Sequence, residues 1–330
     1  MKSIYLDYNA TTPLDPAVRE AMLPFFGDFY GNPSSIHSVG RKVRAFLDDC
    51  RERVAGVWKC KASEVVFTSG ATESINMAIC GAARFLKPKG RHIITSAVEH
   101  HAVLHAIEYL VNKEGFEKTI LPVDVDGAVN PQDLENAICD NTILVSIMAA
   151  NNETGTIQPV SELGSVCRRA GVCFLTDAVL WFGKEPFDNI HQFNADLVSI
   201  CGHKFYGPKG SGALFIKSPL LLDPIFFGGS HENERRAGTE NMAAIVGKMP
   251  ARLKVRKLSD HSIALHGGYL TGGFGDNPFA TLDGYRGVAI VLNGDVIDKT
   301  VRHIHRHQRL GLQYYVINPH MEARHFNNPI

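Results

Sequence analysis

Short apolar runs alternate along most of this chain with longer segments whose apolar residues recur at helical spacing. The apolar runs cover residues 65–68, 92–96, 118–123, 142–149, 172–177, 196–200 and 212–217. The helical segments lie near 72–86, 100–113, 131–138 and 161–170, after two earlier helices at 16–22 and 38–58. Apolar strands separated by helices are typical of a mostly parallel sheet sandwiched by helices, the α/β class. Ligands of such sheets bind beyond the carboxyl ends of the strands, so we expect a site in the polar turns there.

The pattern changes after about residue 248. Pro250 interrupts it, and residues 266–287 are rich in glycine and show no helical period. Residues 287–292 and 312–317 are apolar enough to form strands. A chain of 330 residues is long enough for two domains, or for one large domain with a smaller partner.

The composition is that of an ordinary globular enzyme, with 45% hydrophobic and 21% charged residues. The formal net charge is zero, so we expect no attraction to nucleic acid or to an anionic membrane. The seven cysteines form no CxxC pair, which is typical of reduced thiols in a reducing compartment. No run approaches 18 apolar residues, and the first four residues lead directly into a motif described below. The sequence therefore predicts a cytoplasmic protein without a targeting peptide.

Three strand ends carry side chains that suit one cofactor. Lys204 follows the strand at 196–200, among apolar and aromatic neighbours, where an amine loses hydration and can become a Schiff-base nucleophile. Taken alone it would read as an ordinary loop lysine. Asp177 ends another apolar strand, and a buried carboxylate there needs a cationic partner. The turn before Ala71 and Thr72 opens a helix whose first backbone amides can bind phosphate. A lysine, an aspartate and a phosphate turn together fit pyridoxal 5'-phosphate (PLP).

The motifs around these residues resemble those of the cysteine desulfurase family, the class V aminotransferases that depend on PLP. The match extends from residue 1 to about 247. It consists of Tyr5-Leu6-Asp7-Tyr8-Asn9-Ala10-Thr11-Thr12-Pro13, Gly31-Asn32-Pro33-Ser34-Ser35, Thr68-Ser69-Gly70-Ala71-Thr72-Glu73-Ser74, Glu99-His100, Asn151-Asn152-Glu153-Thr154-Gly155, Asp177-Ala178, Gly202-His203-Lys204 and Arg236-Ala237-Gly238-Thr239-Glu240-Asn241.

The resemblance implies a fold-type I PLP enzyme in three parts. Residues 1–14 are an N-terminal segment that packs with a small domain, residues 15–248 are the large PLP-binding domain, and residues 249–330 are the small C-terminal domain. The match ends before this last part, which is therefore divergent or disrupted. One sequence does not separate a diverged domain from a frameshift in the gene.

The resemblance also assigns roles to individual residues. Lys204, His100 and Asp177 are the expected catalytic residues: Lys204 bonds the cofactor, Asp177 holds its pyridinium proton, and His100 stacks on its ring and moves protons. The other expected cofactor-binding residues are Ala71, Thr72, Asn152, Cys201, His203 and Thr239. The family threonine matched by Thr239 reaches the phosphate of a partner subunit, which implies a homodimer.

The implied reaction converts L-cysteine to L-alanine and passes the sulfur to a protein thiol, for iron–sulfur cluster or thio-cofactor assembly with an acceptor or scaffold protein. Three departures bear on it. Leu180 stands where the family has glutamine, Cys201 stands where it has serine, and no cysteine follows Cys201 to accept the sulfur. The expectation is therefore an impaired desulfurase. The alternatives are another PLP lyase, a selenocysteine lyase or a non-catalytic PLP-binding protein.

No metal site is expected. His303, His305 and His307 would share one face of an extended segment, but arginines interleave with them and no carboxylate or thiol completes a ligand set. A solvated basic strand is the simpler interpretation.

Overall fold

The computed structural model describes residues 7–247 together with 264–265, 268–269, 288–291 and 314–317. Internal contacts divide the chain into two compact units, which are described separately. The larger unit comprises residues 12–151 and 156–256, and the smaller comprises 1–11, 152–155 and 257–330. The three domain boundaries expected from the sequence stay a prediction.

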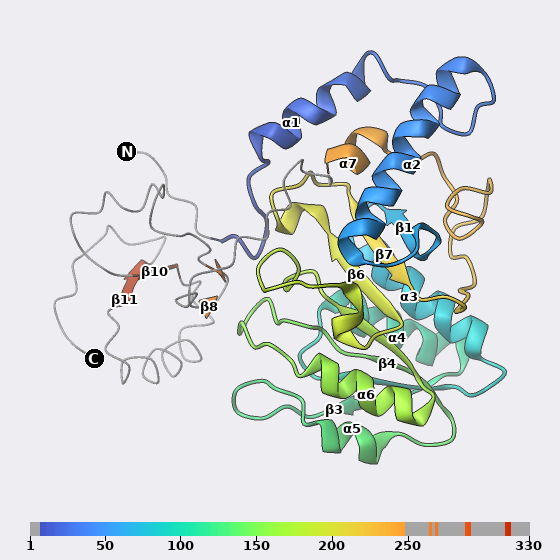
Figure 1. The fold of residues 1–330 in the computed structure, drawn as a ribbon. Coiled ribbons are helices and arrows are strands. Elements are labelled where there is room, and N and C mark those ends of the chain that lie inside the picture. The colour runs from blue at the N-terminus through green and yellow to red at the C-terminus, as the bar shows by residue number, and fades with distance from the viewer. Residues whose placement is uncertain (1–6, 248–263, 266–267, 270–287, 292–313, 318–330) are drawn as a thin grey trace. The chain divides into compact units, whose positions relative to one another are not determined.

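The larger unit is built on a seven-stranded sheet with the order β1-β7-β6-β5-β4-β2-β3 (Figure 1). Strands β2 to β6 run parallel to one another, whereas β7 is antiparallel to both β6 and β1. The strands are β1 (Val65–Thr68), β2 (His92–Ser96), β3 (Glu117–Leu121), β4 (Thr142–Ser146), β5 (Cys173–Asp177), β6 (Leu197–Cys201) and β7 (Gly212–Ile216). The mostly parallel α/β sheet expected from the sequence is confirmed.

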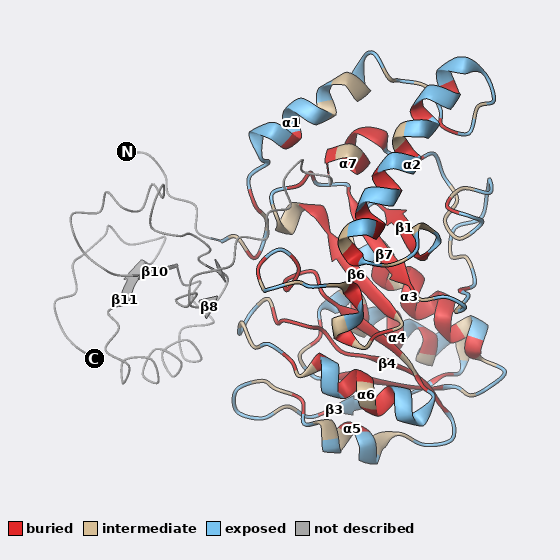
Figure 2. Cartoon of the chain, viewed as in Figure 1, coloured by how far each residue is buried: buried red, intermediate tan, exposed pale blue. Residues whose placement is uncertain are grey.

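Helices cover both faces of this sheet, so β1, β2, β4, β6 and β7 are buried from end to end, and β5 is buried except at its first residue (Figure 2). One apolar cluster joins α3 and α4 to side chains such as Val66 and Leu175, and another joins α2, α5 and α6 to side chains such as Phe67 and Phe174. The helices are α1 (Pro16–Met22), α2 (Ser38–Trp58), α3 (Ala71–Leu86), α4 (His101–Glu114), α5 (Pro131–Ala137), α6 (Val160–Ala170) and α7 (Met242–Gly247). Successive strand residues face opposite layers, which explains why the runs are apolar throughout.

Local signals account for several helix ends. Asp15 accepts a hydrogen bond from Ala17 N at 2.7 Å and begins α1, and Asn130 does the same for α5 through Gln132 N at 2.9 Å. Gly115 and Gly171 end α4 and α6 with φ values of 72° and 68°, in the left-handed region that glycine adopts at low cost.

The element boundaries differ from the predicted ones by a few residues. The largest difference is in β4, which ends at Ser146 instead of residue 149. Beyond Ser146 the chain stays bonded to β5, through Ile147 N to the Leu175 carbonyl and Ala149 N to the Asp177 carbonyl, but it no longer pairs with β2. An apolar run indicates that residues are buried and does not show where a strand ends. Here the buried residues continue past the last residue of β4. Among the described residues no helix is both long and apolar enough to span a membrane.

In the smaller unit, Asn9 Nδ2 donates to the backbone carbonyl of Asn152 at 3.2 Å. Strand β8 (Ala264–Leu265) pairs antiparallel with β9 (Gly268–Tyr269), and β10 (Val288–Val291) pairs parallel with β11 (Tyr314–Ile317). The last two coincide with the strands predicted near 287–292 and 312–317. The His303–His307 run lies outside the described residues.

Candidate active site

The turns that carry the expected chemistry leave the sheet at one edge. Gly212, the first residue of β7, pairs with Thr68 of β1 on one side and with Cys201 of β6 on the other. Neighbouring strands lie about 4.8 Å apart, so the turns that follow Thr68 and Cys201 begin about 10 Å from each other. A Cβ on Gly212 would lie 2.7 Å from Gly70 Cα, so only glycine lets the first of these turns pack over β7.

Lys204 ends a tight 3-10 turn, Gly202–Lys204, that directly follows β6. The backbone N and the Oγ1 of Thr12 each donate to the His203 carbonyl at 2.9 Å, and Thr12 Oγ1 accepts a hydrogen bond from Tyr206 N at 2.7 Å. Gly202 N donates to the Ser211 carbonyl at 2.9 Å. These bonds hold the turn at both ends and leave Lys204 half-buried at the sheet edge.

Asp177 is the last residue of β5 and is only 7% exposed. Its Oδ1 accepts a hydrogen bond from Val179 N at 3.0 Å. Burial raises the pKa of Asp177 to about 6, and the bond from Val179 and the charge of Lys204 act in the opposite direction. Lys204 therefore interacts electrostatically with Asp177, and the two side chains that the sequence singled out share one site.

The phosphate turn expected between β1 and α3 is present. Gly70 occupies the N-cap position of α3 and has no side chain to cap the first amides, those of Ala71 and Thr72. Inside the turn, Thr68 Oγ1 and Ser74 Oγ lie 2.7 Å apart, and Ser74 N donates to the Gly70 carbonyl at 3.1 Å. A 16-residue helix that begins this way offers amides and a positive dipole end to an anion.

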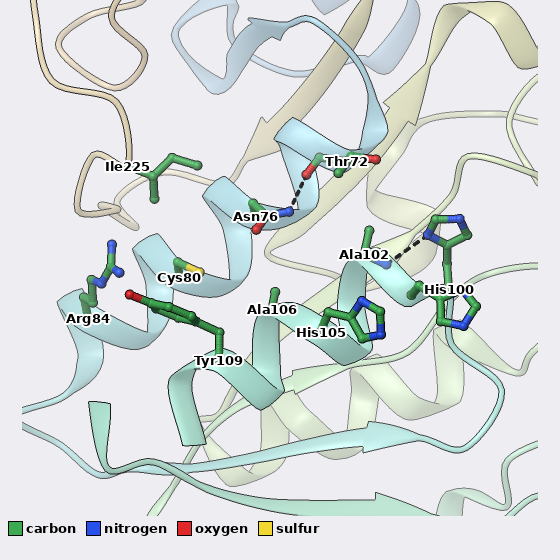
Figure 3. A pocket seen from close by; sticks show the side chains of 11 residues that line it. Thr72, Asn76, Cys80, Arg84, His100, Ala102, His105, Ala106, Tyr109 and Ile225 are labelled. Carbon is green, nitrogen blue, oxygen red and sulfur yellow. Dashed lines mark hydrogen bonds between the residues drawn. The ribbon is translucent and has the colours of Figure 1, made fainter. Parts of the chain in front are cut away.

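His100 is the N-cap residue of α4, and its Nδ1 accepts a hydrogen bond from Ala102 N at 3.1 Å. An acceptor nitrogen carries no proton, so the ring proton of the neutral imidazole lies on Nε2. The ring is exposed and lies near Thr72 at one end of a hollow of about 610 Å³ between α3 and α4 (Figure 3). The hollow is lined by Thr72, Asn76, Cys80, Arg84, His100, His101, Ala102, His105, Ala106, Tyr109 and Ile225.

His203, Cys201 and Thr239 belong to the same unit but differ in exposure. Burial, with the charges of Lys204 and Lys209, lowers the pKa of His203 to about 4, so its imidazole is neutral at physiological pH. Cys201 is 3% exposed, and its Sγ lies 3.7 Å from the Ser211 carbonyl. Thr239 is exposed.

Two further residues from the sequence analysis have different surroundings. Asn152 belongs to the smaller unit, where its Nδ2 donates to Glu153 Oε1 at 2.7 Å. Leu180 is 6% exposed and is part of the apolar cluster on the α2 side of the sheet.

One buried acid was missed as a functional residue. Glu99 is 7% exposed, and its Oε1 accepts hydrogen bonds from Ser96 Oγ at 2.7 Å and Met148 N at 2.9 Å. Its Oε2 is buried and has no hydrogen-bond partner among the described residues. Burial, with a smaller contribution from the charge of Asp177, raises the pKa of Glu99 to about 8. Glu99 therefore fixes the turn before His100 and adds a proton-holding carboxyl next to Asp177.

These groups fit PLP. A buried Asp177 carboxyl whose pKa is raised gains most from a cation such as a pyridinium nitrogen. The uncapped start of α3 suits the phosphate, and Lys204 lies between the strands that carry both. Among the described residues no group of three or more His, Cys, Asp and Glu side chains is arranged to hold a metal ion. The expected absence of metal stays a prediction, because part of the chain is not described.

Comparison with known proteins agrees with this arrangement. The sequence pattern of the class-V aminotransferases matches residues 4–263. The chain therefore belongs to the class-V aminotransferase family, and the family expected from its motifs is confirmed.

Individual relatives narrow the comparison. The cysteine desulfurase IscS of Dictyoglomus turgidum is 52% identical over 246 residues, which make up 74% of this chain and 62% of that protein. The cysteine desulfurase IscS of Methanosarcina thermophila is 49% identical over 246 residues, 74% of this chain and 60% of that protein.

Comparison with solved structures also finds similar folds. A NifS-like protein superposes with a TM-score of 0.72 at 40% identity, over 75% of this chain and 68% of that chain. SspA in complex with cysteine superposes with a TM-score of 0.71 at 38% identity, over 74% of this chain and 71% of that chain. The matched part of the chain spans about three fifths of the length of the two IscS relatives. The activity of this chain is therefore proposed below.

Proposed function

We propose that this chain binds PLP through Lys204 and acts on L-cysteine as a cysteine desulfurase, releasing L-alanine. The observation that carries the proposal is the joint placement of Lys204, the buried Asp177 and the phosphate turn at one sheet edge. Relatives that bear the name cysteine desulfurase, and a similar structure solved with cysteine, support the substrate class.

The proposed roles follow from the contacts of each residue. Ala71 and Thr72 bind the phosphate through the amino end of α3. Asp177 keeps a positive charge on the ring nitrogen, and the cofactor then supplies an electron sink for bonds broken at the amino acid. His100 is exposed and is placed to give a proton from Nε2, and Lys204 Nζ takes up or returns one when it is not bonded to the cofactor.

The described thiols do not suit the sulfur-transfer step. All seven cysteines of the chain lie in the described residues, and all are free thiols. Cys139 is the exposed one, but it precedes β4 and so lies at the amino edge of the sheet, opposite the site. Burial raises the pKa values of Cys60 and Cys167 to about 12, and it also raises those of Cys80 and Cys173. A thiol with such a pKa is not ionised at neutral pH and is a weak nucleophile.

Slow turnover is therefore the expected result for L-cysteine. Alanine formation should be at least about a hundredfold slower than a well-placed thiolate allows, which corresponds to about 2.7 kcal/mol of barrier. An added dithiol should accelerate it. The assay is alanine release from L-cysteine with and without dithiothreitol. Cys139→Ser is the matched control, because it removes the exposed thiol and should leave the rate unchanged if that thiol does not accept the sulfur. Rapid formation of a persulfide on any of the seven cysteines without an acceptor would contradict this expectation.

A second candidate is a lyase reaction on a related small amino acid, such as selenocysteine, that needs no protein thiol. The position of Cys139 at the opposite edge of the sheet and the raised pKa values of the Cys60, Cys80, Cys167 and Cys173 thiols favour it. The two candidates separate by substrate: selenocysteine turnover that needs no dithiol, alongside cysteine turnover that does, would support the lyase. Binding of PLP without turnover of either substrate would leave a non-catalytic PLP-binding protein.

The proposal includes a homodimer, with an acceptor or scaffold protein as a further partner. The hollow between α3 and α4 begins at Thr72 and His100, and exposed apolar side chains occur near it in the chain segment of Ile225, with Phe226 46% and Phe227 87% exposed. A second copy is proposed to cover these side chains, and the shared site follows from the family resemblance of Thr239. The cytoplasmic location stays a proposal that rests on the free thiols.

Sedimentation equilibrium of the full chain is expected to give twice the monomer mass of 36.2 kDa. Phe227→Glu should weaken the dimer, because it places a charge where an apolar side chain is to be buried. Val125→Glu is the control, since Val125 is fully exposed on another part of the unit. A monomer at micromolar concentration would rule out the shared site.

A further inference from the structure

The loop segment 231–240, which lies between β7 and α7, is fastened to the strand that carries the phosphate turn. Its Glu232 is buried and forms a bidentate ion pair with Arg51 of α2 at 2.6 and 2.7 Å. Glu232 Oε2 also accepts a hydrogen bond from Phe67 N of β1 at 2.8 Å. One end of the 231–240 segment is thus fixed against β1 itself.

The other end is fixed to the turn. Arg236 Nε donates to Glu73 Oε1 at 2.7 Å and its Nη2 to Glu73 Oε2 at 3.3 Å, with the two side chains 18% and 8% exposed. Glu73 Oε2 also accepts hydrogen bonds from the hydroxyl of Ser69 and from Ser69 N, the latter at 2.9 Å. Glu73 therefore joins the first residue of the turn to an arginine 163 positions further along the chain.

Glu73 lies in the first turn of α3, beside the amides proposed to bind phosphate. A carboxylate there favours the helix, because it interacts with the positive end of the dipole. The same negative charge opposes an incoming phosphate. Arg236 removes this conflict: burial acts to raise the pKa of Glu73, but the hydrogen bond and charge of Arg236, with the hydrogen bonds from Ser69, hold it below its usual range, so the pair stays ionised and carries no net charge.

The neighbouring arginine does not share this role. Arg235 Nη2 donates to the Ser63 carbonyl at 2.8 Å and its Nε to the Glu232 carbonyl at 3.1 Å. The structure gives each of the two arginines a partner within its own subunit, and of the two only Arg236 contacts the phosphate turn.

We infer that Glu73 and Arg236 are positioning residues for cofactor binding: Glu73 shapes the phosphate turn through Ser69, and Arg236 cancels the charge that Glu73 brings there. The inference rests on the proposed PLP site. It predicts a specific non-additivity, because an unpaired Glu73 should be worse for phosphate binding than no charged pair at all.

The test measures the dissociation constant of PLP by absorbance titration of the full-length apoprotein at pH 7.5. Arg236→Gln should weaken PLP binding by about tenfold or more. The double variant Glu73→Gln/Arg236→Gln should bind PLP more tightly than Arg236→Gln alone. Arg235→Gln is the matched control and should stay within about twofold of the parent protein. Unchanged binding in Arg236→Gln, or a double variant weaker than Arg236→Gln, would overturn the inference.

A second measurement needs no cofactor and separates this inference from the proposed function. Hydrogen exchange of the apoprotein should show faster exchange in a peptide covering residues 68–72 for Arg236→Gln, because Glu73 is no longer held against Ser69. Exchange unchanged by Arg236→Gln would refute the positioning role even if PLP binds. If Arg236→Gln shows this faster exchange but the parent protein binds neither PLP nor inorganic phosphate, the proposed function is refuted, and the charge-cancelling role is refuted with it.

Discussion

Lys204→Ala is expected to abolish covalent attachment of PLP and with it the yellow colour of the purified protein. The half-buried Lys204 ends a turn braced by Thr12, and its charge interacts with Asp177 at the proposed ring position. Alanine has no amine, and without an amine the side chain forms no bond with the cofactor's aldehyde. The measurement is the absorbance spectrum before and after borohydride reduction, followed by peptide mapping of the reduced adduct.

Two control variants make this result specific. Lys204→Arg keeps the positive charge near Asp177 but should lose the reducible adduct as completely as Lys204→Ala, since a guanidinium does not bond the aldehyde. Lys209→Ala removes an exposed lysine of the same loop and should keep the adduct. An adduct that persists on another lysine in Lys204→Ala would show that the attachment site is assigned wrongly.

Glu99→Gln is expected to raise the free energy of unfolding of the apoprotein, and this gain should become larger as the pH rises. The pKa of Glu99 is raised from 4.5 to about 8 in the folded state, chiefly by burial. The folded protein therefore holds a proton that the unfolded chain has released. Between these two pH values the parent protein loses up to about 1.4 kcal/mol of unfolding free energy per pH unit through this group. Glutamine does not titrate, and its Oε1 still accepts from Ser96 and Met148.

The free energy of unfolding in urea, measured for both proteins at pH 5, 6.5 and 8, checks this prediction. The advantage of Glu99→Gln should be small at pH 5 and reach several kcal/mol at pH 8. Glu114→Gln is the control, because it should lower the free energy of unfolding at neutral pH instead of raising it. The hydrogen bond from Arg84 lowers the pKa of Glu114, so its stabilising effect is present at neutral pH and lost in acid. A pH-independent difference for Glu99→Gln would mean that Glu99 is already ionised in the folded protein.

The sequence predicts those parts of the site that depend on local order along the chain. Lys204, Asp177 and the start of α3 each follow an apolar strand directly, and parallel strands bring such ends to one edge. The family motifs add His100. Its place as the N-cap of α4 was missed by one residue, because histidine is not among the usual capping residues.

Contacts between distant segments were not predicted. Glu73 and Arg236 both stand in recognised motifs, but their pairing depends on the path of the 231–240 segment, which no periodicity reveals. The raised pKa of Glu99 depends on full burial beside a second carboxylate, and a charged residue before a histidine gives no sign of either. The sequence does show that Glu99 stands beside His100 inside a matched motif, and this position is the signal that could have marked it as a functional candidate.

The place of β1 in the sheet bears on how the protein is made. β1 is an edge strand whose one strand neighbour in the described sheet is β7, and Val65 pairs with Phe215. At a synthesis rate of about 5–20 residues per second, the ribosome needs roughly 8–30 s to pass from one partner to the other. Throughout that time the apolar residues of β1 have no strand to pair with, and the phosphate turn has no Gly212 to rest on. We therefore expect the proposed cofactor site to form only after the whole sheet has been synthesised, and a nascent chain that ends at β6 to leave the apolar residues of β1 without their strand partner.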